Sequence, residues 1–281
     1  MFYKGIVTQA VKDNFQVLVN QKIINCSASQ KIKLTNKIVC GDHVEVDLEN
    51  SYIIKIFERK NFITRPKTAN IDKALITTSF KEPDLATLLI DKLILFYELH
   101  KIEPILVFTK KDLIQNNEYQ DIINDYSNAG YEIIQTNINN FDAKPFQEQI
   151  NNNVVMFAGQ SGVGKSTILN HLDPDLNIST NEISHALNRG KHTTTKNTLY
   201  RLFDGLVCDT PGFSSIQQIA DKKVELAKLF KDFATLSQEC KFSDCLHIEE
   251  KVCKIKEQVG ISIAENRYNN YVLIIKKVKE K

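Results

Sequence analysis

Residues 159–166 read Gly-Gln-Ser-Gly-Val-Gly-Lys-Ser and match G-x-x-x-x-G-K-[ST], the pattern of a phosphate-binding loop. The apolar stretch Val154–Ala158 precedes the loop and predicts a buried strand, and Ser166–Leu172 follows it and predicts a helix. A strand, a glycine-rich loop and a helix in this order form the context in which the motif binds nucleotides. We therefore expect phosphates to be held by Gly159, Gln160, Ser161, Gly162, Val163, Gly164, Lys165, Ser166 and Thr167.

Each part of this loop has a chemical role. Glycines let backbone N–H groups turn inward around the phosphates, and the N-terminus of the following helix adds the positive end of its dipole. Lys165 is expected to reach the β- and γ-phosphates and to act in catalysis, and the Ser166 hydroxyl to coordinate Mg²⁺. The loop alone does not distinguish ATP from GTP.

A second motif, Thr109-Lys110-Lys111-Asp112, lies upstream of the loop and resembles the [NT]-K-x-D base reader of GTPases. A carboxylate at its last position can accept hydrogen bonds from the N1–H and the exocyclic amine of guanine, which adenine cannot offer. Lysine-rich surface turns are common, so the string alone is weak. It follows the apolar strand Ile105–Phe108, however, and ligands bind at the carboxyl ends of parallel strands. We expect guanine to be read here.

The order of the motifs is rotated relative to ordinary GTPases, in which the phosphate-binding loop comes first. Here the base reader precedes that loop, and two switch motifs follow it: Gly190-Lys191-His192-Thr193-Thr194-Thr195 and Asp209-Thr210-Pro211-Gly212. Such a circular permutation preserves the site, because each loop still lies at the end of its own strand. We expect Thr194, or a neighbouring threonine, and Asp209 to join Ser166 around Mg²⁺, and the Gly212 amide to sense the γ-phosphate.

The residue that orients the attacking water is less obvious. Many GTPases carry a glutamine directly after D-x-x-G, but this chain has Phe213, which cannot form a side-chain hydrogen bond. The nearest candidate in sequence is His192, whose neutral imidazole could accept a proton or hold the water. The alternative is that His192 only packs within its loop.

Strands and helices alternate from residue 70, which predicts a mostly parallel sheet covered on both faces. One predicted helix runs from Asp84, as its cap, to His100. The first 68 residues instead contain short strands with turn signals between them, which favours a small OB-type barrel. Residues 59–67 are expected to form a basic linker.

Charge is unevenly distributed along the chain. Residues 1–68 contain 11 Lys and Arg against 6 Asp and Glu, residues 69–225 contain 14 against 20, and residues 226–281 contain 11 against 8. Basic ends around an acidic middle are expected if the ends contact a polyanion such as RNA. Scattered, solvated lysines are the alternative.

Cysteine and histidine cluster near the C-terminus. Cys240, Cys245, His247 and Cys253 give C-x4-C-x-H-x5-C within fourteen residues, and three thiolates with one imidazole complete a tetrahedral zinc site. The spacing departs from the commonest C-x2-C pattern, so by itself it leaves ordinary core cysteines as an alternative. The other three, Cys26, Cys40 and Cys208, are expected to be core residues. No apolar stretch approaches the ~20 residues that span a bilayer, and we expect a cytoplasmic protein with reduced thiols.

The permuted order, the segments 189–195 (RGKHTTT) and 209–213 (DTPGF) and the cysteine cluster together resemble the ribosome small-subunit-dependent GTPase A family (RsgA, YjeQ or EngC). The resemblance covers essentially the whole chain. It implies an OB barrel, a permuted GTPase and a zinc-binding domain, in a GTPase that binds the 30S subunit, contacts 16S rRNA and acts late in small-subunit maturation. Thr109 stands where many members have asparagine, and Gln135-Thr136-Asn137 replaces the expected S-A-[KT] loop.

From these features we predict three domains: an OB-fold RNA-binding domain at 1–68, a circularly permuted GTPase domain at 69–225 and a helical zinc-binding domain at 226–281. The protein is predicted to be a monomeric, ribosome-stimulated GTP hydrolase with one structural Zn²⁺, and Mg²⁺ bound with GTP. Two alternatives are a non-catalytic RNA-binding module with a structural nucleotide and an ATP-dependent kinase or transport ATPase. The two switch motifs disfavour the first, and Asp112 disfavours the second.

Overall fold

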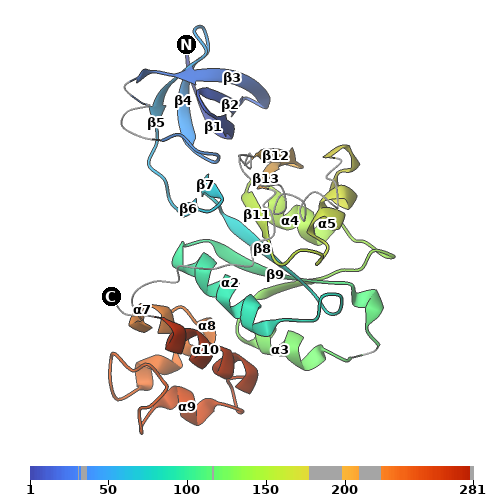
Figure 1. Cartoon of the computed structure of the whole chain (residues 1–281), viewed down its shortest axis with the longest axis vertical. Coiled ribbons are helices and arrows are strands. Elements are labelled where there is room, and N and C mark those ends of the chain that lie inside the picture. The colour runs from blue at the N-terminus through green and yellow to red at the C-terminus, as the bar shows by residue number, and fades with distance from the viewer. Residues whose placement is uncertain (31, 33–36, 116, 177–197, 209–222, 279–281) are drawn as a thin grey trace, which may run out of the picture. The chain divides into compact units, whose positions relative to one another are not determined.

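A computed structural model describes residues 1–30, 32, 37–115, 117–176, 198–208 and 223–278 (Figure 1). The chain divides into two compact units. The first contains residues 1–74, 143–157 and 169–211, and the second contains residues 75–142, 158–168 and 212–281. Both therefore combine segments that are distant in the sequence.

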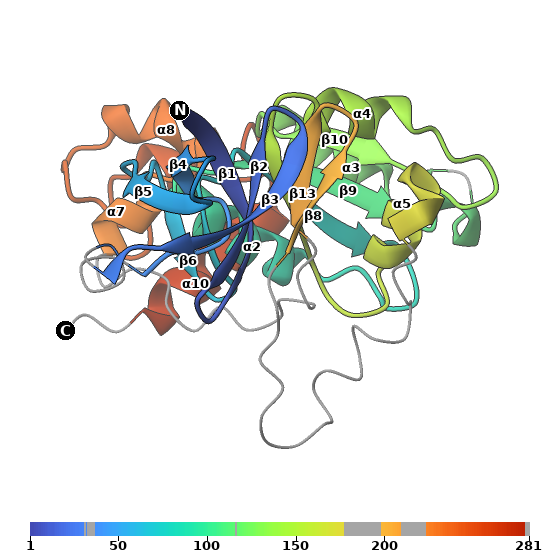
Figure 2. The same ribbon diagram turned by 90° about the horizontal axis from the view of Figure 1, so that it is seen from above.

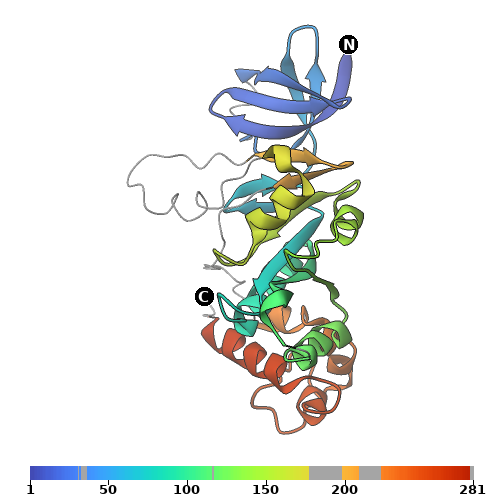
Figure 3. The same cartoon turned by 90° about the vertical axis from the view of Figure 1, so that its right-hand side faces the viewer.

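The N-terminal strands of the first unit close into a barrel, in the order β1-β2-β3-β5-β4 (Figure 3). Apolar side chains alternate along these strands, so that Val17, Val19, Val44 and Val46 are buried inside it. The predicted barrel is confirmed. Its strands are β1 (Phe2–Val11), β2 (Asn14–Val19), β3 (Lys22–Ala28), β4 (His43–Asp47) and β5 (Tyr52–Ile56).

The predicted basic linker is wrong, because part of it forms an antiparallel hairpin, β6 (Phe62–Thr64) and β7 (Lys67–Ala69). Its inward side chains are buried, and the Ala69 N–H donates to the Cys40 carbonyl at 2.9 Å. The Asn61 side chain also exchanges two hydrogen bonds with the backbone of Ile71. The exposed Arg65 and Lys67 gave the segment its linker-like composition and concealed these buried contacts.

A six-stranded sheet has the order β10-β9-β8-β11-β13-β12. Figure 2 labels four of its strands, β10, β9, β8 and β13. The pairs β10–β9 and β11–β13 are parallel, and β12 is antiparallel to β13 at the edge. This confirms the predicted mostly parallel α/β core. The strands are β8 (Lys73–Ser79), β9 (Glu103–Thr109), β10 (Glu132–Gln135), β11 (Val154–Ala158), β12 (Leu199–Leu202) and β13 (Gly205–Cys208).

The sheet strands are connected by helices, as expected for such a core. The helix predicted from Asp84 begins only at Thr87, and its N-terminus has no side-chain cap, so the Asp84 cap is wrong. The described helices of this region are α2 (Thr87–Leu99), η1 (Lys111–Leu113), α3 (Gln120–Asn128), α4 (Lys144–Ile150), α5 (Lys165–Leu172) and η2 (Pro174–Leu176).

The C-terminal part of the second unit consists of short helices around a small core. Leu226, Phe230, Phe233 and Tyr271 are buried there, and Leu95 of α2 belongs to the same cluster. Because α2 contributes to this core, the C-terminal helices pack directly on the nucleotide-binding fold. They are α7 (Lys223–Ala227), α8 (Lys231–Ala234), η3 (Leu236–Glu239), α9 (Lys254–Gln258) and α10 (Glu265–Lys277).

Candidate functional site

The phosphate-binding loop connects the buried strand β11 to helix α5, as its motif predicts. Three of its glycines have positive φ: 138° at Gly159, 81° at Gly162 and 99° at Gly164. At Gly159 two observations exclude a side chain: the positive φ, and the 2.0 Å that would separate a Cβ atom from the Thr77 carbonyl oxygen. At Gly159 the backbone can therefore take this path only with glycine, and the positive φ at Gly162 and Gly164 favours glycine there.

Lys165, the first residue of α5, is only 3% exposed. Its ammonium donates hydrogen bonds to the carbonyls of Gly159 at 2.9 Å and Gln160 at 2.5 Å. The side chain is thus folded back over its own loop, within reach of an anion that the loop amides would bind. The hydroxyl-bearing Ser166 follows it and is also buried, at the N-terminus of the same helix.

The base-reading motif begins at the carboxyl end of β9. Thr109 is the last residue of that strand, Lys110 adopts a left-handed conformation, and the next residues form the short turn η1. This turn exposes the Asp112 carboxylate, as a base reader requires. The Lys110 ammonium donates to the carbonyl of Glu82.

A side-chain hydrogen bond joins the two motifs. The Thr109 hydroxyl oxygen lies 2.6 Å from the carbonyl oxygen of Val163, inside the phosphate-binding loop, and 3.1 Å from that of Thr78 in β8. The structure therefore brings together two sequence motifs that are fifty-four residues apart.

Thr136 also lies in this region, in the segment Gln135-Thr136-Asn137 that replaces the expected S-A-[KT] loop. It follows strand β10, where its N–H donates to the Phe108 carbonyl and its own carbonyl accepts from the Lys111 N–H. Its hydroxyl is buried without a hydrogen-bond partner among the described residues. Its place in Gln135-Thr136-Asn137, directly after a parallel strand, was the available signal.

Several predicted site residues lie outside the described residues. These are the water-positioning candidate His192, the magnesium candidates Thr194 and Asp209 with the neighbouring threonines, and Gly212. Their roles stay predictions from the sequence.

The four predicted metal ligands come together in the C-terminal part of the second unit. The ligand atoms of Cys240, Cys245, His247 and Cys253 all lie within 4.8 Å of one another. The His247 Nδ1 atom is 3.6 Å from Cys240 Sγ and 3.4 Å from Cys253 Sγ, and the two sulfurs are 4.0 Å apart. Zinc–ligand bonds of about 2.0–2.3 Å give tetrahedral edges of roughly 3.5–3.8 Å. The residues thus fit one tetrahedral ion.

Burial favours the uncharged forms of three of these ligands. It raises the pKa of Cys245 to about 12, raises that of Cys253 and lowers that of His247. Each group is therefore neutral by itself at pH 7, and a bound cation would stabilise the thiolates.

The loop that carries the metal ligands is held in place by its neighbours. The Glu250 carboxylate accepts hydrogen bonds from the N–H groups of Leu246 at 2.6 Å and Ile248 at 2.9 Å. From helix α10, the Tyr268 hydroxyl donates to the His247 carbonyl and the Tyr271 hydroxyl to that of Leu246. These contacts support the backbone of the loop that carries the ligands.

A buried ionic network fastens helix α10 to helix α2. Arg267 is fully buried, and its guanidinium donates two hydrogen bonds of 2.8 Å to the carboxylate of Asp232 and one of 2.5 Å to Asp91. The Asn270 amide donates to the other oxygen of Asp91 at 2.7 Å. No sequence motif pointed to this network.

Arg59, the first residue of the segment 59–67 that was expected to form a basic linker, has an internal role in the first unit. Its guanidinium donates to both carboxylate oxygens of the buried Asp42, at 2.6 and 2.9 Å, and to the Lys37 carbonyl at 2.7 Å. Its side chain is only 26% exposed. Arg65 and Lys67 are both exposed.

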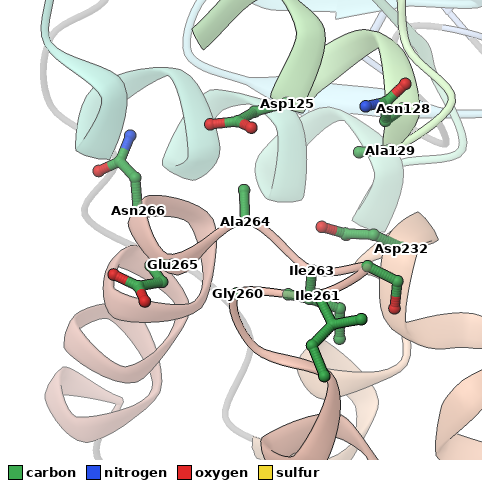
Figure 4. A pocket seen from close by; sticks show the side chains of 11 residues that line it. Asp125, Asn128, Ala129, Asp232, Gly260, Ile261, Ile263, Ala264, Glu265 and Asn266 are labelled. Atoms are coloured by element: carbon green, nitrogen blue, oxygen red, sulfur yellow. The ribbon is translucent and has the colours of Figure 1, made fainter. Parts of the chain in front are cut away.

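A pocket of about 350 Å³ lies in the second unit between the end of α3 and the start of α10 (Figure 4). Asp125, Asp232 and Glu265 line it, together with Asn128 and Asn266. It is separate from the nucleotide motifs and contains acidic groups, which disfavours a phosphate ligand. None of the helices described by the structure is long and apolar enough to cross a membrane.

Comparison with known proteins agrees with this geometry. The family model described as RsgA GTPase matches residues 56–219. The small ribosomal subunit biogenesis GTPase RsgA of Limosilactobacillus reuteri is 39% identical, over 95% of this chain and 94% of the relative. The protein of that name from Malacoplasma penetrans is 42% identical, over 91% and 92%.

Two solved structures are similar over nearly the whole chain. YloQ, described as a circularly permuted GTPase, superposes with a TM-score of 0.84 at 31% identity, covering 99% of this chain and 95% of that one. YjeQ from Thermotoga maritima gives a TM-score of 0.84 at 32% identity, covering 99% of both chains.

Proposed function

The chain belongs to the RsgA GTPase family, and from this premise we propose that it binds the 30S ribosomal subunit and hydrolyses GTP there, late in small-subunit maturation. One observation carries the proposal. The hydrogen bond from Thr109 to Val163 holds a guanine-reading turn against a phosphate-binding loop. The named relatives, which are small-subunit biogenesis GTPases, support the ribosomal part.

In this proposal the described residues bind and orient the nucleotide. The amides of residues 159–167 hold the phosphates, and Lys165 exchanges its contacts with the loop carbonyls for contacts with phosphate oxygens. The Asp112 carboxylate reads the N1–H and the amine of guanine. Lys110 and Lys111 complete the base-reading turn.

Magnesium, when bound with GTP, would neutralise charge on the phosphate oxygens. The Ser166 hydroxyl lies at the helix N-terminus where it would hold the ion, and Thr194 and Asp209 are the further candidates from the sequence. Gly212 would sense the γ-phosphate through its amide, and His192 would position the attacking water.

For the cysteine cluster we propose Zn²⁺, one per chain, with a structural role. Four protein ligands leave no open position for catalysis. The domain that the ion would hold together has a small core, so metal binding would contribute much of its folding free energy.

We propose the division 1–68, 69–225 and 226–281 into barrel, GTPase and zinc-binding domains, acting as a monomer in the cytoplasm. The barrel and the zinc-binding domain would contact 16S rRNA, which the positive balance of both terminal regions supports.

The decisive experiment measures phosphate release from GTP with and without purified 30S subunits. We expect slow intrinsic hydrolysis and a clear stimulation by 30S, with ATP unable to compete. A 50S preparation serves as the matched control. Nucleotide binding without phosphate release under either condition would instead indicate an RNA-binding module with a structural nucleotide.

A further inference from the structure

Guanine offers hydrogen-bond donors on one edge and acceptors on the other. The N1–H and the 2-amino group donate, and a carboxylate such as that of Asp112 can accept both. O6 and N7 only accept, so a protein reads them with a donor. The nearest side chain of the motif that carries a hydroxyl is Thr109, three residues before Asp112.

The Thr109 hydroxyl is already committed within the protein. Thr109 is only 4% exposed, and its hydroxyl oxygen lies 2.6 Å from the Val163 carbonyl oxygen and 3.1 Å from the Thr78 carbonyl oxygen. A hydroxyl has one hydrogen to donate. Both neighbouring atoms are carbonyl oxygens, which only accept. The hydroxyl therefore donates its single hydrogen to the backbone, and the shorter of the two contacts is to Val163.

Turning the hydroxyl toward the nucleotide would be unfavourable. Val163 is 1% exposed, and the phosphate-binding loop packs against the threonine, so that a Cβ atom at Gly164 would lie 3.8 Å from it. Leaving a buried carbonyl without its partner costs more than one new hydrogen bond returns. The lone pairs that remain on the oxygen cannot bind N7, which is itself an acceptor.

We propose that Thr109 is a positioning residue that fastens the base-reading turn to the phosphate-binding loop, and that this GTPase selects guanine without reading N7. The proposal rests on the proposed base-reading role of Asp112. The ligands it predicts are guanine nucleotides that keep the N1–H and 2-amino groups, whether or not position 7 of the purine is nitrogen.

The test compares the dissociation constants of GDP, 7-deaza-GDP and IDP on the full-length protein by isothermal titration calorimetry. We expect 7-deaza-GDP to bind within about twofold of GDP, because no hydrogen bond is lost. IDP, which lacks the 2-amino group, should bind at least about fivefold more weakly, the factor for one hydrogen bond. A loss of about fivefold or more for 7-deaza-GDP would overturn the proposal.

Variants at position 109 separate positioning from base reading. Thr109→Val removes the hydroxyl at nearly equal volume and should weaken GDP and 7-deaza-GDP by the same factor, whereas Thr109→Ser should restore both affinities. Thr109→Asn replaces the single O–H donor by an amide with two N–H donors, and a preference for GDP over 7-deaza-GDP should then arise. If Thr109→Val lowers the affinity for GDP but not for 7-deaza-GDP, the hydroxyl reads N7 and the proposal is wrong.

Failure of the underlying base-reading role gives a different pattern. Equal binding of IDP and GDP would exclude Asp112 as the base reader. If Thr109→Val still weakens the binding of GDP and 7-deaza-GDP by the same factor, the positioning role of Thr109 between the turn and the loop would stand on its own. Melting temperatures of all three variants, measured without nucleotide, show whether each protein is folded.

Discussion

Arg267 on helix α10 donates a hydrogen bond across 2.5 Å to Asp91 on helix α2, and neither residue is exposed to solvent. The same guanidinium binds Asp232 through two further hydrogen bonds, and its central carbon lies 5.1–5.3 Å from the ring centroids of Tyr126, Tyr131 and Phe230. One side chain thus joins the C-terminal helices to a helix of the nucleotide-binding fold.

Removing that side chain should be strongly destabilising. Arg267→Ala leaves two carboxylates without their cation, and breaking a buried ion pair costs about 3–5 kcal/mol. Urea unfolding measures the change, with Lys277→Ala, at an exposed position of the same helix, as the control. A cost below about 1 kcal/mol would mean that the pair behaves as a surface ion pair.

The base reader can be tested by changing one atom of its side chain. Asp112→Asn should weaken GTP binding by about 2–4 kcal/mol, because it removes a charge-assisted pair of hydrogen bonds. Xanthosine triphosphate should then be preferred, since its carbonyl accepts where the guanine amine donates. An unchanged GTP affinity in a titration would exclude Asp112 from the site.

The metal cluster predicts one zinc per chain in native mass spectrometry. Cys245→Ser should lose the ion and the order of residues 240–260, while GTP binding persists, because no zinc ligand belongs to the nucleotide motifs. Cys26→Ser, at a buried cysteine of the barrel, is the matched control and should retain the ion. Acid should release zinc as its ligands are protonated. A protein without metal, or with a disulfide under reducing conditions, would contradict the assignment.

Ribosome binding should depend on the basic N-terminal region. Neutralising Lys60, Arg65 and Lys67 together should weaken 30S association, and affinity should fall with salt by about 0.7–0.9 in log–log slope per phosphate contact. Arg59 is left unchanged in this variant. It forms an ion pair with the buried Asp42, so replacing it would also destabilise the fold. Affinity that does not change with salt would identify these residues as ordinary solvated surface.

His192 remains the sequence-based candidate for positioning the water. His192→Ala should abolish most of the 30S-stimulated rate and leave GTP affinity and 30S binding nearly intact. Single-turnover phosphate release measures this. A stimulated rate within about threefold of the native protein, below about 1 kcal/mol in barrier terms, would exclude the histidine.

The sequence by itself determined the features whose geometry is local. The phosphate-binding loop is one run of residues, and its path follows from glycines at positions such as Gly159, where no other residue can adopt the backbone conformation. The metal ligands lie within fourteen residues of one another, and Asp112 lies three residues after the end of its strand. Alternating apolar residues likewise identified the barrel and the parallel sheet.

Only the tertiary structure decided which polar side chains already have a hydrogen-bond or ion-pair partner within the protein. The Thr109 hydroxyl lies on the Val163 carbonyl and the Arg59 guanidinium on the Asp42 carboxylate, and neither partner follows from the sequence motifs. Arg267 and Asp91 are 176 residues apart, and no local pattern connects them. A hydrogen bond or ion pair between distant segments depends on how the chain folds back on itself, and residue type and spacing do not contain that information.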